Sequence, residues 1–211
     1  GDRQTSLRFV RALKNRFGPT DEVGCFDMTG SGIAEVSDPS ALFLGHGDPE
    51  PGTCVTIAME GRRALPVEIQ ALTVKQTAPN PRRIVNGVDS SRVAMVLAVL
   101  ESRMGVSLAD KDVYVSTVGG VRLVEPAADL AIAIAVANAV QNRKVSKRLA
   151  AIGELTLTGE IRNVTQAAQR ASEAARLGYH TVLDSSSRKL AQALNELKVR
   201  GMPREEAVPE F

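Results

Sequence analysis

Three arginines form a basic cluster in the sequence and are the first candidates for chemistry. Arg82 and Arg83 follow a proline, and Arg92 lies within the helix predicted next along the chain. A guanidinium group can hold two phosphate oxygens at once, so this cluster is a candidate for binding phosphate groups. The alternative interpretation is a solvated loop in which Asp89 pairs with Arg83 or Arg92.

A phosphate-binding Walker loop needs the pattern GxxxxGK[ST], in which backbone amides and one lysine hold the phosphates. Gly47 and Gly52 have the required spacing, but Thr53 follows and no lysine stands there. This stretch is rich in Gly, Pro and Asp, which is typical of a linker. We therefore expect the chain as given to lack a Walker loop and to be no enzyme on its own.

Metal ligands are scarce in this sequence. The two cysteines, Cys25 and Cys54, and the two histidines, His46 and His180, lack the spacing of a four-ligand zinc site. Isolated thiols in apolar stretches are typical of small buried residues, which favours a reducing cytoplasm. We expect no metal and no cofactor in this chain.

The elements that must position these residues follow from hydrophobic spacing and turn signals. A helix is predicted after an N-cap at Asp89 or Ser90, and a second, almost wholly apolar helix is predicted over 127–142. Two further helices are predicted over 165–177 and 188–197. The predicted strands cover 7–17, 22–28, 53–60, 63–74, 113–117, 149–152, 155–158 and 180–183.

Composition indicates a globular protein. Of the 211 residues, 44% are hydrophobic and 24% are charged, which disfavours disordered, collagen-like and membrane classes. The formal net charge of +2 calls for no nucleic acid, so any DNA binding must use local clusters. The mixture of strands and helices from Thr53 to about Leu197 predicts an α+β or α/β domain. The residues before it resemble the end of a preceding domain, and the first residue, Gly1, suggests a fragment.

A family resemblance rests first on the run Lys14, Asn15, Arg16, Phe17 and Gly18. This is the KNRFG motif of the RadA (Sms) family of bacterial DNA-repair and recombination ATPases. The resemblance implies that residues 1–50 are the end of a RecA-like ATPase domain with its linker. It also implies a Lon-protease-like domain over 51–200 and a frayed tail over 201–211. The expected fold class is α+β, with the ribosomal-protein-S5-like arrangement of strands and helices.

The Lon resemblance rests on residues 153–161 and 125–129. Counting from these segments puts Ala127 at the position of the nucleophilic serine and Arg170 at the position of the catalytic lysine. Alanine has no oxygen, and arginine keeps its proton at physiological pH, so the two cannot act as a nucleophile and base. We therefore expect no peptidase activity, and we expect Arg170 to pair with a carboxylate such as Asp129.

Two other functions remain open at this point. One is a divergent Lon-type serine peptidase in which Ser116 or Thr117 replaces the nucleophile, with Asp129 as a conceivable base. The other is an oligomerisation scaffold without affinity for DNA.

The resemblance implies a non-proteolytic domain that assembles into a ring, a hexamer in this family, and contacts DNA during homologous recombination and branch migration. Lys14 and Arg16 would reach the nucleotide of a neighbouring subunit in the parent protein, a DNA-dependent ATP hydrolase. ATP, Mg and Zn are expected only with the domains missing from this chain. A RecA-type recombinase is the expected partner, the location is cytoplasmic, and no membrane is involved.

Overall fold

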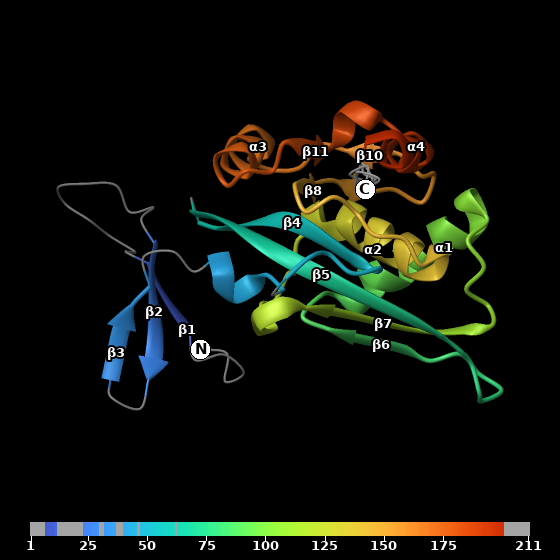
Figure 1. Ribbon diagram of the computed structural model, residues 1–211, viewed down its shortest axis with the longest axis horizontal. Helices are drawn as coiled ribbons and strands as arrows, with labels where there is room; N and C mark the ends of the chain where they lie inside the picture. Colours follow the sequence, from blue (N-terminus) through green and yellow to red (C-terminus); the bar gives the residue numbers. More distant parts are fainter. Residues whose placement is uncertain are drawn as a thin grey trace, which may run out of the picture.

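The computed structural model describes residues 7–11, 23–29, 32–36, 40–45, 47–61 and 63–200. A six-stranded mixed sheet dominates these residues and carries helices α1 to α4, while a smaller sheet of three strands lies to one side (Figure 1). The prediction of mixed strands and helices is therefore confirmed. None of the helices described is both long enough and apolar enough to cross a membrane.

The large sheet has the strand order β11-β8-β4-β5-β7-β6. Its centre is the antiparallel hairpin predicted around the turn after Glu60, and β7 extends the hairpin antiparallel to β5. Parallel neighbours complete both edges. The strands are β4 (Thr53–Glu60), β5 (Arg63–Lys75), β6 (Arg83–Asn86), β7 (Lys111–Thr117), β8 (Leu149–Ala151) and β11 (Thr181–Leu183).

The core lies between this sheet and helix α2 (Asp129–Gln141), which packs against β4 and β5. Every residue from Asp129 to Asn138 is buried, as the apolar sequence predicts for a helix surrounded on all sides. Helix α1 (Ser90–Met104) packs beside α2. Helices α3 (Ala167–Arg176) and α4 (Leu190–Arg200) flank β8 and β11 in Figure 1.

Local signals set the ends of α1. The side chain of Asp89 accepts a hydrogen bond from the amide of Arg92, which confirms the predicted N-cap. At the other end Gly105 takes the left-handed conformation (φ 63°), which an L side chain adopts only at a cost. The first turn of the helix therefore fixes the backbone position from which the Arg92 side chain extends.

The small sheet pairs β1 (Leu7–Arg11), β2 (Val23–Thr29) and β3 (Gly32–Glu35) in antiparallel order. Its Cys25 and the Phe43 of the short 3-10 helix η1 (Ser40–Phe43) are buried in the main hydrophobic core. Gly119 in η2 (Val118–Gly120) lets η1 lie close, because a Cβ there would stand 2.4 Å from the carbonyl oxygen of Leu42. Cys25 and Cys54 are both buried free thiols, as predicted.

Two short segments illustrate where the structure differs from the sequence predictions. Arg83 opens strand β6, which pairs with β7, where the sequence predicts only a stiff loop. The predicted strand over 155–158 is a turn, because the hydroxyl of Thr156 accepts from the amide of Glu160 and closes it. Only β9 (Glu154–Leu155) and β10 (Ile161–Arg162) pair on either side of this turn.

Candidate functional site

Arg170 occupies the centre of the site that the Lon resemblance predicts. It lies on α3 with its side chain wholly buried (0% exposed), although it is one of the largest and most polar side chains. Its Nη1 and Nη2 donate to the two carboxylate oxygens of Glu125, at 2.8 and 2.5 Å. Nη1 also donates to the carbonyl oxygen of Ile57, and Nε donates to that of Thr165 at 2.9 Å. A buried guanidinium needs this many acceptors to offset its desolvation.

Ala127 lies close to this ion pair in the chain. It belongs to the short 3-10 helix η3 (Pro126–Ala128), which begins directly after Glu125 and leads into α2. Its side chain is a buried methyl group (2% exposed), and its carbonyl oxygen accepts from the amide of Gly153 at 3.0 Å. The described side chains here therefore offer a permanent cation and a methyl group, and Arg170 cannot accept a proton.

The prediction that Arg170 pairs with a carboxylate is confirmed, but the residue suggested for it, Asp129, was wrong. The sequence led us to expect a carboxylate such as Asp129, but Arg170 pairs with Glu125, on the backbone that precedes η3. Asp129 begins α2 and faces Arg92 instead. Sequence reasoning did not name Glu125, although a buried arginine requires a carboxylate and Glu125 is the first residue of the matched segment 125–129.

A second ion pair joins α1 to α2. Arg92 donates through Nε to Oδ1 of Asp129 at 3.1 Å and through Nη2 to Oδ2. The amide of Leu155 also donates to Oδ2 at 3.0 Å, and Glu154 lies 3.7 Å from the Arg92 guanidinium. The Arg92 side chain is 24% exposed, whereas that of Asp129 is 2% exposed. The Arg92 guanidinium thus binds Asp129, and the hydrogen bond that Arg92 donates to Asp89 comes only from its backbone amide.

The electrostatics of this pair follow from burial. Desolvation raises the pKa of Asp129, and hydrogen bonds from Arg92 and the amide of Leu155 act in the opposite direction. The hydrogen bonds with Asp129 raise the pKa of the Arg92 guanidinium. Asp129 also stands in the first turn of α2, where a negative charge interacts favourably with the helix dipole.

The other two arginines of the basic cluster lie at the sheet edge. Arg83 donates from Nη1 to the carbonyl oxygen of Lys111 and from Nη2 to that of Leu108, at 2.5 and 3.0 Å. The amide of Arg82 donates to Asp112 at 2.7 Å, and no described residue bonds the Arg82 guanidinium. The three arginines therefore have different surroundings, and among them only Arg82 extends a guanidinium without a bond to a described residue.

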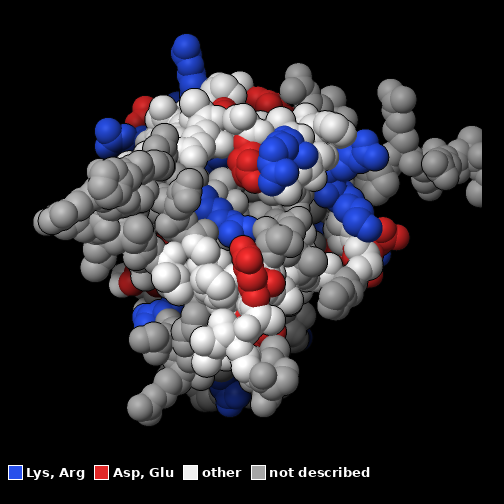
Figure 2. Space-filling model, turned by 90° about the vertical axis from the view of Figure 1, so that its left-hand side faces the viewer, with Lys and Arg blue, Asp and Glu red and all other residues white. Residues whose placement is uncertain are grey.

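Charge is mixed on the face shown in Figure 2. There, Lys and Arg side chains of the described residues alternate with Asp and Glu and do not merge into one broad patch. This agrees with the small net charge of the chain. Phosphate binding on this face would depend on individual side chains rather than on a large positive field.

The residues proposed for a relocated peptidase site have other partners. The hydroxyl of Ser116 donates to the carbonyl oxygen of Thr117 at 3.3 Å, and that of Thr117 donates to the carbonyl oxygen of Val121 at 2.6 Å. Asp129 is bound by Arg92. Among the residues that the structure covers, no group of three or more His, Cys, Asp or Glu side chains could hold a metal ion.

The KNRFG residues, Lys14 to Gly18, lie outside the described residues, as do residues 201–211. The assignment of Lys14 and Arg16 to a neighbouring subunit's nucleotide therefore stays a prediction.

The chain is similar to known proteins over most of its length. The family model for subunit ChlI of Mg-chelatase matches residues 88–187. The DNA repair protein RadA of Mycolicibacterium smegmatis is 50% identical over 184 residues, which are 87% of this chain and 39% of that protein. RadA of Halalkalibacterium halodurans is 45% identical over 184 residues, 87% of this chain and 40% of that protein. RadA of Mycobacterium tuberculosis is 48% identical over 184 residues, with coverage of 87% and 38%.

At this level of identity, most of the chain is similar to part of the proteins named DNA repair protein RadA. The chain belongs to the RadA family, which confirms the resemblance carried by the KNRFG motif. It spans about two fifths of the length of these relatives.

The comparisons also overturn one prediction. The sequence led us to expect a chain that is no enzyme, with its Walker loop absent. The ChlI match over residues 88–187 and the RadA identity over the same region point to the nucleotide-binding region of an ATPase. The prediction was wrong because it rested on one short loop pattern, tested at Gly47 and Gly52. A functional site is formed by residues from a whole region of the fold, which a single pattern does not sample.

Proposed function

We propose that this chain is the part of a RadA-type, ATP-dependent DNA repair protein that contacts DNA and assembles the protein in homologous recombination and branch migration. The observation that carries the proposal is the 50% identity with a DNA repair protein over 87% of this chain. In this proposal residues 1–50 end a RecA-like ATPase domain, residues 51–200 form a Lon-like domain and residues 201–211 are a tail. The protein acts in the cytoplasm.

The proposed Lon-like domain has no peptidase activity. Two observations support this proposal: Arg170 pairs with Glu125, two residues before Ala127, and the positions matched to a nucleophile and base hold a buried methyl group and a paired cation. Arg170 would then join α3 to the backbone before α2 as a structural contact. Hydrolysis of casein by the purified chain, blocked by a serine-directed reagent, would instead support the divergent peptidase.

The proposed DNA contacts are Arg82, Arg83 and Arg92. Arg82 has the strongest structural support, because its guanidinium has no bond to a described residue and it lies at the exposed start of β6. Arg83 and Arg92 already bind carbonyl and carboxylate oxygens, so a phosphate would have to share or replace these acceptors. Even weak sites would add up if a ring, a hexamer in this proposal, presents several copies.

The test of this proposal is a DNA mobility-shift titration at two salt concentrations. Arg82→Gln alone, and together with Arg83→Gln, is expected to weaken binding and to reduce the salt dependence by about one released counterion for each phosphate that is no longer neutralised. Arg162→Gln removes one exposed charge elsewhere and serves as the control. An unchanged salt slope in the double variant would eliminate both arginines, and no shift with the unaltered chain would favour a scaffold without DNA affinity.

Assembly and nucleotide contact complete the proposal. Mass in solution, measured with and without DNA, tests the ring and the ligand in one experiment. Lys14 and Arg16 would contact nucleotide across a subunit boundary, where a fixed cation stabilises charge on the transferred phosphoryl group. A RecA-type recombinase is the proposed partner, and ATP and Mg, together with Zn in a domain outside this chain, are the proposed cofactors of the whole protein.

A further inference from the structure

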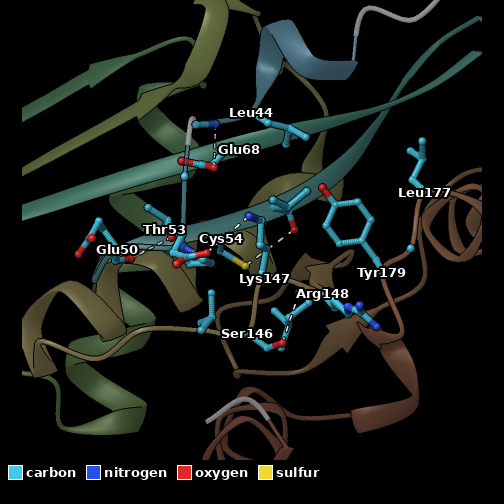
Figure 3. Close-up of a pocket in the computed structure, with 18 of the residues that line it drawn as sticks. Leu44, Glu50, Thr53, Cys54, Glu68, Ser146, Lys147, Arg148, Leu177 and Tyr179 are labelled. Carbon is cyan, nitrogen blue, oxygen red and sulfur yellow. Dashed lines mark hydrogen bonds and ion pairs between the residues drawn. The ribbon is translucent and has the colours of Figure 1, made fainter. Parts of the chain in front are cut away.

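One cavity, with a volume of about 600 Å³, is lined by none of the residues of the two ion pairs. One wall is the hairpin of β4 and β5, and the others are the loop between α2 and β8 and the residues between α3 and β11 (Figure 3). A space of this volume is within the range of small-molecule sites. Both loops also fall within residues 88–187, the region matched by the ChlI family.

The loop between α2 and β8 makes one end of this cavity positive. It contributes Ser146, Lys147 and Arg148, and His180 completes this end. No described residue bonds the Arg148 guanidinium, and the ion pair of Lys147 with Asp48 is long at 3.5 Å and exposed. An exposed pair of this kind contributes little, so an incoming anion can replace Asp48. A hydroxyl group beside two cations is a set of donors suited to phosphate oxygens.

The middle of the cavity is apolar. Tyr179 and Leu177 follow α3 and line it, and Cys54 faces it from β4. In Figure 3 the Tyr179 side chain extends away from Arg148 and carries its hydroxyl group toward the cavity. Burial raises the pKa of Tyr179 to about 12, so this hydroxyl keeps its proton. Tyr179 is only 8% exposed and packs in a hydrophobic cluster, so it can contact a nucleobase but offers no open face for stacking.

The far end carries acceptors. Glu68 accepts from the amide of Gly45 at 3.0 Å and from the amide group of Gln70 at 2.9 Å, which fix the carboxylate at the cavity wall. Its remaining lone pairs can accept from the amino group of a base or from a sugar hydroxyl. The cavity thus orders a phosphate end, a ring-sized apolar middle and an acceptor end.

We propose that this cavity binds one phosphate-bearing nucleotide unit, with the phosphate on Ser146, Lys147 and Arg148 and the base beside Tyr179. The unit is either a free nucleotide or the phosphorylated end of a DNA strand, which share this chemistry. The proposal rests on the proposed role in ATP-dependent DNA repair. It adds a site separate from Arg82, Arg83 and Arg92.

The test is calorimetric titration of the 211-residue chain with three probes: deoxyadenosine monophosphate, a 5′-phosphorylated oligonucleotide and the same oligonucleotide without the phosphate. Arg148→Gln is expected to weaken binding of the phosphorylated probes about tenfold, the effect typical of removing one charge-assisted hydrogen bond. Ser146→Ala should weaken binding less, without a change of charge. Arg162→Gln removes a matched charge from β10 outside the cavity and is expected to leave binding within about twofold.

The outcomes separate the possibilities. Preference for the mononucleotide identifies a free nucleotide as the ligand, and preference for the phosphorylated over the unphosphorylated oligonucleotide identifies a strand end. Absence of binding by all probes, or equal weakening in Arg148→Gln and Arg162→Gln, would overturn the cavity proposal. If the mobility shift still depends on Arg82 in that case, the proposed function stands while the cavity proposal fails. If the probes bind in the cavity but the chain shifts no DNA, the cavity proposal stands while the proposed DNA contact fails.

Discussion

Two arginine–carboxylate pairs hold helices in this protein, and they differ in how far water reaches them. Arg170 is wholly buried and pairs with Glu125, which is 29% exposed. Arg92 is 24% exposed and pairs with Asp129, which is almost wholly buried. In the first pair the cation is shielded from water, and in the second pair the anion is.

This difference determines what each pair can do. Arg170 has acceptors on Glu125, Ile57 and Thr165, so its removal leaves carbonyl oxygens as well as a carboxylate without their donor. Arg92 keeps one side in contact with solvent, where a ligand could approach it. The Arg170 pair therefore acts only as a structural contact. The Arg92 pair is also structural, but its arginine can in addition be reached by a ligand from solvent.

The largest effect is expected from Arg170→Met. Removing one partner of a buried pair typically costs about 3–5 kcal/mol, and three protein groups would be left without their donor here. Urea denaturation followed by circular dichroism measures the change in stability. Arg176→Met on the same helix is the matched control, because the Arg176 side chain is 67% exposed and the cost is expected to be below about 1 kcal/mol. Equal stability of Arg170→Met and the unaltered chain would contradict the structural role.

A smaller effect, about 2 kcal/mol at neutral pH, is expected from Arg92→Met, because water can partly replace the missing guanidinium. The destabilisation should depend on pH. Burial already raises the pKa of Asp129, and removing Arg92 raises it further because a group that lowers it is gone. In the variant, the charged Asp129 carboxylate lowers the free energy of unfolding at any pH above its folded-state pKa. This destabilisation is lost as the pH falls through that pKa, because the carboxylate then becomes protonated and neutral. Urea denaturation at neutral and acidic pH should therefore show a smaller destabilisation in acid.

A control for Arg92→Met removes both charges. Arg92→Met with Asp129→Asn should recover part of the stability at neutral pH and remove the pH dependence, since no buried carboxylate remains in the pair. A destabilisation by Arg92→Met that is the same at both pH values would contradict the assignment of the cost to Asp129.

The sequence predicted the elements that carry these pairs better than the pairs themselves. The apolar run of α2 and the cap at Asp89 are local signals, and both hold in the structure. The partner of Arg170 was not predictable in the same way, because Glu125 and Arg170 meet only through the packing of α3 on β4. Strand β6 was missed because this short segment has no strong strand pattern of its own. It becomes a strand because it pairs with β7.

The cavity was missed for a related reason. The basic residues between α2 and β8 are as concentrated as Arg82 and Arg83, but the sequence does not show that Tyr179 and Glu68 face them. A run of charged residues usually lies on a solvated surface. Only the fold shows that this run lines a cavity instead.

Tyr179 extends the comparison to a buried group without an ionic partner. Burial raises its pKa to about 12, above the ordinary value of 10, so the folded state holds this proton more tightly than the unfolded state. The free energy of unfolding should therefore fall by about 1.4 kcal/mol per pH unit between these two values. Tyr179→Phe removes this slope, and ultraviolet titration of phenolate in a Tyr114→Phe background measures the pKa directly. A Tyr179 pKa near 10 would show that water reaches the hydroxyl.

The smallest effect is expected from Lys144→Gln. Lys144 lies 3.0 Å from Glu50, within hydrogen-bond range, yet the two side chains are 47% and 69% exposed. Water and salt screen such a pair, so the destabilisation in urea should be below about 1 kcal/mol and should shrink further in added salt. An effect as large as that of Arg92→Met would mean that distance, rather than burial, governs these ion pairs. Because the distances from Lys144 and Arg170 to their carboxylates differ little, unequal effects of the two variants would show that this distance alone does not set the contribution to stability.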